Sequence, residues 1–235
     1  MRVSNKAHRV MTIVAAILML LEMLFSGAST LINMISNVAN GVTSANYILT
    51  TVVGLLTSTI VAIPVLVALF RGKKDTLAGV LFLAAALITV VQSVFGRVAN
   101  IISMAAMSAG SHEAIFVSMQ IANTILLIVG VIVLAVRVLL AFECFKPGMI
   151  SGNMMKWVLI LLPVVAAVLA TAAGGIQRAG MFNRMEMAAY IAAVLLPGVL
   201  TFIGGIPEIM LAIAFAIPVY EKQEPAMPEE SPSTF

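Results

Sequence analysis

The last long apolar stretch of the chain decides its fold class: residues 188–220 read AAYIAAVLLPGVLTFIGGIPEIMLAIAFAIPVY. A straight helix of this length would extend about 50 Å, whereas the hydrocarbon core of a bilayer is about 30 Å thick. The stretch contains Gly204, Gly205 and Pro207, and a helix bends or opens most easily at such residues because glycine lacks a Cβ and proline lacks a backbone N–H. We therefore expect a membrane-spanning segment that is kinked or broken here, or that turns back as a re-entrant hairpin.

The composition agrees with a membrane protein. The 235 residues are 62% hydrophobic and only 10% charged, which excludes a soluble globular domain of this size. Five further apolar runs of near-spanning length precede the last one, at 10–35, 47–70, 76–95, 115–142 and 157–173. The first run also resembles a cleaved signal peptide, but its length favours an uncleaved helix. The sequence predicts an all-α, polytopic transmembrane bundle of six spanning helices with the lipid bilayer around it.

The basic residues predict the orientation of this bundle. Six crossings place both termini on one side, and ten of the thirteen Lys and Arg residues then fall at that side. Because positively charged flanks stay in the cytoplasm, we expect a plasma membrane protein with cytoplasmic N- and C-termini. The net charge of +3 is thus a topology signal, and no nucleic-acid partner is expected.

The domain organisation is simple. Residues 1–220 form one transmembrane domain, in which helical-hairpin repeats near 10–75, 76–155 and 156–220 are as well explained by chance similarity. A division into two inverted three-helix halves is the other arrangement considered. Residues 221–235 hold four glutamates and three prolines and predict a disordered, acidic tail.

Two carboxylates are the main candidates for a functional site. Glu22 and Glu208 are both expected near the middle of the membrane, where an uncompensated charge costs at least about 2.5 kcal/mol. If they face one cavity, they could bind a proton or a cation together with backbone carbonyls freed between Gly204 and Pro207, with Gly205 part of the same break. The alternative is two separate, protonated glutamic acids that hold helices together.

Other polar residues fall inside the expected spans. Gln92, Gln120 and Asn123 are candidates for a vestibule in the outer half, although hydrogen bonds between helices explain them equally well. For Arg137, a side chain that extends to the membrane surface is favoured over an ion pair with either glutamate.

The sequence contains no motif of a known enzyme class. Zinc-helix, nucleophile-elbow and phosphate-loop patterns are missing, so we expect no enzyme, no cofactor and no metal site. The function most in keeping with the two carboxylates is transport of a small solute or ion. The alternative is a non-catalytic subunit that binds a membrane-protein partner, or a second copy of itself, through helix faces and the tail. We expect a transporter to bring Glu22, Glu208 and several of Asn33, Gln92, Gln120 and Asn123 to one cavity, and a non-catalytic subunit to scatter them.

Overall fold

The computed structural model describes residues 3–39, 45–107, 113–148, 153–181, 196–217 and 219–220. These residues form long helices, namely α1 (Asn5–Ala39), α2 (Ala45–Arg71), α3 (Thr76–Met107), α4 (Glu113–Phe145), α5 (Asn153–Met181), α7 (Leu196–Gly204) and α8 (Ile206–Ala216). Six segments are long and apolar enough to cross a bilayer, the last of them formed by α7 and α8 together. The predicted all-helical architecture with six spans is confirmed.

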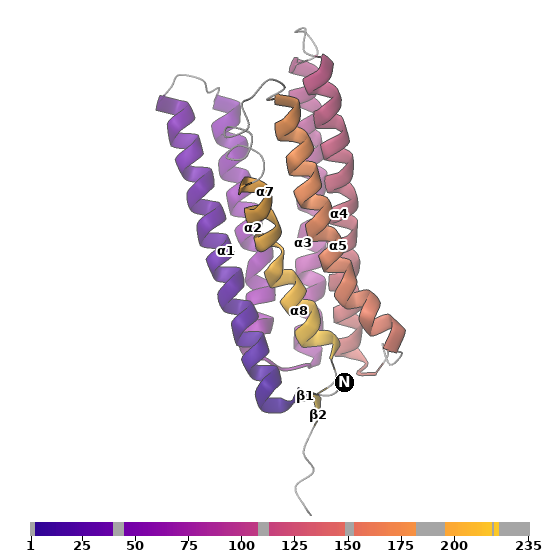
Figure 1. The fold of residues 1–235 in the computed structure, drawn as a ribbon. Coiled ribbons are helices and arrows are strands. Elements are labelled where there is room, and N and C mark those ends of the chain that lie inside the picture. The colour runs from indigo at the N-terminus through magenta and orange to yellow at the C-terminus, as the bar shows by residue number, and fades with distance from the viewer. Residues whose placement is uncertain are drawn as a thin grey trace, which may run out of the picture.

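The spans form a ring in the order of the chain (Figure 1). Each of α1 to α4 packs against the next helix, α5 packs against α7 and α8, and α8 closes the ring against α1. This arrangement brings the middle of α1, α3, α4 and α8 towards a shared interior. Residues distant in the sequence can therefore meet there.

The last span is bent by 25° and continues in one direction (Figure 1). Gly205 separates α7 from α8, and its N–H donates to the Phe202 carbonyl at 3.0 Å in a tightened turn. Pro207 in the first turn of α8 has no N–H to donate to the carbonyl four residues earlier, which explains why the bend occurs here. The predicted kink is therefore present, and the re-entrant hairpin is not formed by the residues described.

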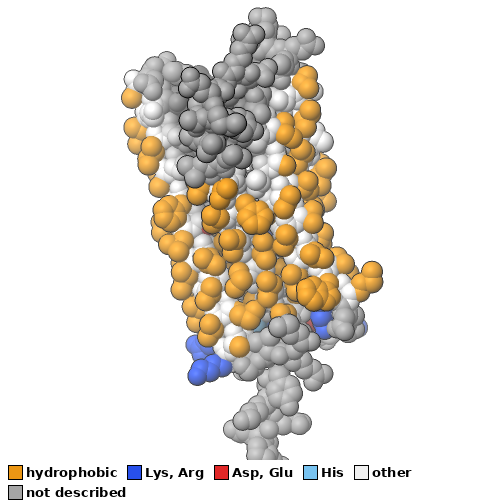
Figure 2. All heavy atoms as spheres, viewed as in Figure 1, with side chains coloured by type: hydrophobic (Ala, Val, Ile, Leu, Met, Phe, Trp, Pro, Cys, Tyr) orange, Lys and Arg blue, Asp and Glu red, His pale blue; other side chains and the backbone are white. Residues whose placement is uncertain are grey.

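Both described ends of the chain lie at one end of the bundle, which we call the terminal end. Strand β1 (Val3–Ser4) pairs in parallel with strand β2 (Val219–Tyr220) there. Figure 2 shows hydrophobic side chains over the wall of the bundle and Lys and Arg side chains gathered at the terminal end. This is the distribution expected for a bundle whose wall faces lipid and whose terminal end meets water.

Lys74, in the loop between α2 and α3, also lies at the terminal end. Its Nζ donates to the carbonyl of Phe215 at 2.8 Å and to that of Ile217. These carbonyls belong to the end of α8, where the last groups of a helix lack partners within the helix and carry a partial negative charge. Burial lowers the pKa of Lys74 to about 8. Lys74 therefore fastens the α2–α3 loop to the end of the final span.

The buried core fills the half of the bundle next to the terminal end. Its largest members are Phe82 on α3 and Phe215 on α8, whose rings meet edge to face with centroids 4.9 Å apart. Small residues surround them, among them Ala15 and Ala16 on α1 and Ala212 on α8. Such residues let helices approach closely, which matters because lipid gives spanning helices no hydrophobic reason to associate.

The third helix is longer than the apolar run at 76–95, since α3 continues to Met107. The predicted disordered tail, 221–235, lies outside the described residues.

Candidate functional site

An ion pair connects α4 and α8 inside the bundle. Arg137 donates from Nη2 to Oε1 of Glu208 at 2.5 Å, and the two side chains are 6% and 23% exposed. Arg137 lies eight residues before the end of α4 at Phe145, and Glu208 lies eight residues before the end of α8 at Ala216. At about 1.5 Å per residue, both lie about 12 Å inside their helices.

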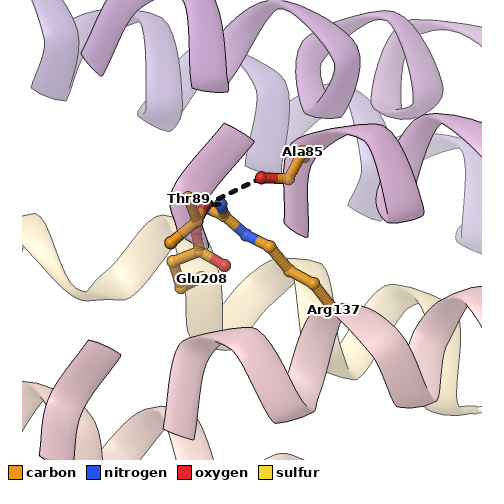
Figure 3. Close-up of polar contacts among 4 residues, drawn as sticks. All are labelled: Ala85, Thr89, Arg137 and Glu208. Atoms are coloured by element: carbon orange, nitrogen blue, oxygen red, sulfur yellow. Dashed lines mark hydrogen bonds and ion pairs between the residues drawn. The ribbon is translucent and has the colours of Figure 1, made fainter. Parts of the chain in front are cut away.

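Thr89 on α3 completes the arrangement around Arg137 (Figure 3). Arg137 donates from Nη1 to Thr89 Oγ1 at 2.6 Å, and the Thr89 hydroxyl in turn donates a hydrogen bond to the Ala85 carbonyl at 2.8 Å. The guanidinium thus bridges the third and the last span. The Nε atom of Arg137 is buried and has no partner among the described residues.

The expectation that Arg137 extends to the membrane surface is wrong. The sequence placed the end of the fourth span at residue 142, whereas α4 continues to Phe145. The added length puts Arg137 more than two turns from the helix end, and Glu208 lies within reach. A buried pair is favoured there because each charge compensates the other where water cannot.

Glu208 occupies a favourable position for a negative charge. It is in the first turn of α8, directly after the bend, and the helix dipole favours a negative charge at the start of a helix. The ion pair with Arg137 adds a full positive charge on its other side. Both features favour a carboxylate at this position.

Glu22 lies on α1, which packs against α8, and approaches the same place. It lies against the bend, since a Cβ added at Gly204 would be 3.6 Å from Glu22 Cγ and 3.8 Å from Oε1. Its side chain is half-buried. No hydrogen bond or ion pair joins Glu22 to another described residue.

A cavity of about 230 Å³ brings these groups together. Its polar and charged lining comes from α1, α2, α3, α4 and α8 and consists of Glu22, Ser26, Ser58, Thr59, Gln92, Arg137 and Glu208. Met19, Met23, Gly27, Leu55, Val61 and Ala62 form the remainder. The cavity can hold several water molecules, whose share of liquid volume is about 30 Å³ each.

The predicted site residues divide into two groups. Glu22, Glu208 and Gln92 line the cavity, and Gly204 lies beside Glu22. Gly205 packs against Ala167 on α5, and Pro207 is buried, so both shape the bend without lining the cavity.

The amides Gln120, Asn123 and Asn33 do not line the cavity. The meeting of several amides that was expected of a transporter is therefore not found there, and the hydroxyls of Ser26, Ser58 and Thr59 supply the uncharged polar lining beside Gln92. Asn123 lies fourteen residues before Arg137 on α4, which is about 21 Å along the helix. Gln120 is one turn further away and exposed, and Asn33 is exposed as well. These amides lie in the half of the bundle away from the terminal end, as their position in the sequence predicts, and are therefore too far from the carboxylates.

Sequence reasoning did not name Thr89, Ser26, Ser58 or Thr59 as site residues. Thr89 is three residues before Gln92 and therefore on the same helix face, which is a usable signal. Hydroxyls in spanning helices are otherwise common, and their grouping becomes visible only in three dimensions.

The described residues contain no group of three or more His, Cys, Asp or Glu side chains placed to hold a metal ion. Comparison with known proteins adds no further information about the site, since no protein-family model, no curated protein and no solved structure matches the chain.

Proposed function

We propose that this multi-pass membrane protein is a transporter or permease for a small solute or ion, and that the cavity between Glu22 and Glu208 is its binding site. The bilayer-spanning architecture is established by the six apolar helices. The transport function is an inference from the interior of the bundle. It includes no catalytic step and no cofactor.

The observation that carries the proposal is the cavity that two acidic residues and one basic residue share. Three charged groups inside spanning helices are costly, and a bundle needs none of them in order to pack. A polar cavity near the middle of a membrane, beside a bent helix, is also the usual place of a transported substrate. An accessory subunit would have no need to gather its charged residues around a cavity.

The terminal half of the bundle favours one direction of access. The tightly packed core around Phe82 and Phe215, the capping of α8 by Lys74 and the pairing of β1 with β2 all lie between the cavity and the terminal end. We infer that this arrangement is closed towards the terminal end, and we propose from the positively charged flanks that this end faces the cytoplasm of a plasma membrane. Transport then requires the terminal half to open.

Thiol labelling tests the proposal without knowledge of the substrate. Ser58, which lines the cavity from α2, is replaced by Cys in a Cys144→Ala background. A membrane-impermeant thiol reagent is then added to right-side-out or to inverted vesicles. We expect Ser58→Cys to react from both sides, because a transporter exposes its binding site alternately.

The matched control is Leu56→Cys on the same helix. Leu56 is 59% exposed on the outside of the bundle and does not line the cavity, so lipid shields it from an aqueous reagent. Equal protection of both cysteines in both vesicle preparations would contradict the proposal. Labelling of Ser58→Cys from one side alone would contradict transport and would mean that the cavity is open to that side only.

A further inference from the structure

The charges around the cavity do not balance. Its charged lining residues are Glu22, Arg137 and Glu208. With all three ionised, the cavity has two negative charges and one positive charge. The excess is one negative charge, which a low-dielectric interior tolerates only if something neutralises it.

The excess falls on Glu22. Arg137 and Glu208 neutralise one another at 2.5 Å, and Thr89 and the first turn of α8 hold the pair in place. Glu22 has no such partner among the described residues, and Gly204 beside it contributes only backbone. A proton or a bound cation is therefore required at Glu22.

The hydroxyl groups near Glu22 are suited to a cation. Ser58 donates its proton to the Leu55 carbonyl at 2.9 Å, and Thr59 donates to the same carbonyl at 2.9 Å. With their protons engaged, both oxygens can only accept or coordinate. Together with the amide oxygen of Gln92 and the carboxylate, they supply the oxygen ligands that hard cations prefer.

The cavity leaves room for water beside a cation. Its volume of about 230 Å³ is several times the share of about 30 Å³ that one water molecule has in the liquid. A cation bound there would thus retain part of its hydration.

We propose that Glu22 binds one monovalent inorganic cation in exchange for one proton, while Arg137 and Glu208 remain paired. In the cation-free state the Glu22 carboxyl is protonated and the cavity is neutral. When the cation enters, the Glu22 O–H bond breaks, the proton leaves to the aqueous buffer, and the carboxylate coordinates the cation. The net charge of the cavity is zero in both states, so neither state leaves an uncompensated charge in the membrane.

This inference rests on the proposed function for its choice of site, but binding alone tests it. The purified protein in detergent micelles, in weakly buffered solution containing a pH-sensitive dye, is mixed with sodium chloride or potassium chloride. N-methylglucamine chloride at equal ionic strength serves as the control for screening. We expect release of about one proton per protein with sodium or potassium, and none with the bulky organic cation.

Variants assign the released proton. Glu22→Gln abolishes the release, whereas Glu22→Asp, which retains the carboxyl group, releases a proton at higher cation concentration. Glu143→Gln serves as the matched control because Glu143 is a glutamate of α4 that does not line the cavity, and we expect full release from it. Thermal unfolding of each variant checks that it is folded.

The outcomes separate this inference from the proposed function. No release from the unmodified protein with either cation, or equal release from Glu22→Gln, overturns cation binding at Glu22. Labelling of Ser58→Cys from both membrane sides would in that case still support a transporter of another substrate. Proton release combined with labelling from one side alone would support the cation site and contradict transport.

Discussion

Arg137 on α4 and Glu208 on α8 are ion-paired inside the bundle, with 2.5 Å between nitrogen and oxygen. The pair unites the fourth span with the last one directly below the bend between α7 and α8. Each charge is acceptable at this depth only because of the other. This mutual dependence gives the first prediction.

Removal of one partner should harm the protein more than removal of both. Arg137→Met leaves Glu208 as an uncompensated buried charge, and Glu208→Gln does the same to Arg137, at a cost of about 3–5 kcal/mol each. The double variant Arg137→Met/Glu208→Gln should be more stable than either single variant. Thermal unfolding in detergent micelles measures the difference as a double-mutant cycle. Additive losses would show that the two side chains act independently.

Lys74 gives the protein a defined response to pH. Burial lowers its pKa from 10.5 to about 8, so between these values the unfolded chain binds more protons than the folded one. Stability should therefore rise as the pH increases from about 8 to about 10. Lys74→Met should remove this rise and should also lower the unfolding midpoint at neutral pH, because the carbonyls of Phe215 and Ile217 lose their donor.

The neighbouring residue provides the control for that experiment. Lys73 is exposed, so Lys73→Met should retain the slope of the unmodified protein. The measurement is the thermal unfolding midpoint of the three proteins in micelles at several pH values. An unchanged slope in Lys74→Met would assign the pH response to another group.

The packing of the terminal half should be sensitive to a cavity at Phe82. Phe82 is fully buried against Phe215, and Phe82→Ala removes roughly 100 Å³, which at about 24 cal/mol per Å³ costs about 2 kcal/mol. The transfer of apolar surface from water adds little here, since the unfolded state is itself in lipid or detergent. Leu87→Ala on the same helix should cost almost nothing, because Leu87 is 66% exposed and lipid fills the space. Equal losses in denaturant unfolding would contradict the assignment of the core.

The fold could be predicted from the sequence because membrane insertion depends on local properties. Runs of apolar residues indicate membrane-spanning helices directly, and the glycines and proline at 204–207 indicate the bend in the last one. Glu22, Glu208 and Gln92 could be named as site candidates since polar residues are conspicuous inside such runs.

The partners of these residues could not be predicted in the same way. Arg137 could extend to the surface if α4 ended a few residues earlier, and it can pair with Glu208 only because α8 packs against α4. Both features depend on the three-dimensional structure. The position of Thr89 beside Arg137 depends on the packing of α3 against α4. Linear sequence contains neither relationship, so hydroxyls at the cavity and hydroxyls elsewhere in the spans look alike.

The two glycines at the bend should respond differently to a methyl group. A Cβ at Gly205 would lie 2.6 Å from Ala167 Cβ on α5, closer than side chains approach, whereas a Cβ at Gly204 would be at an ordinary 3.6 Å from Glu22 Cγ. The backbone of Gly205 has φ −79° and ψ −15°, which alanine adopts freely, so any effect of Gly205→Ala is steric. We expect Gly205→Ala to lower the thermal unfolding midpoint and Gly204→Ala to leave it nearly unchanged.

The steric origin can be tested by removing the opposing methyl group. Gly205→Ala/Ala167→Gly exchanges the methyl groups across the α5–α8 contact and should recover most of the lost stability, apart from about 1 kcal/mol for a glycine inside α5. Failure of this rescue would mean that Gly205 is needed for the bend itself. Proton release on cation addition, measured with Gly205→Ala, then shows whether the contact between Gly205 and Ala167 also positions Glu22. A displaced bend would move Gly204 away from the Glu22 carboxylate and reduce the release.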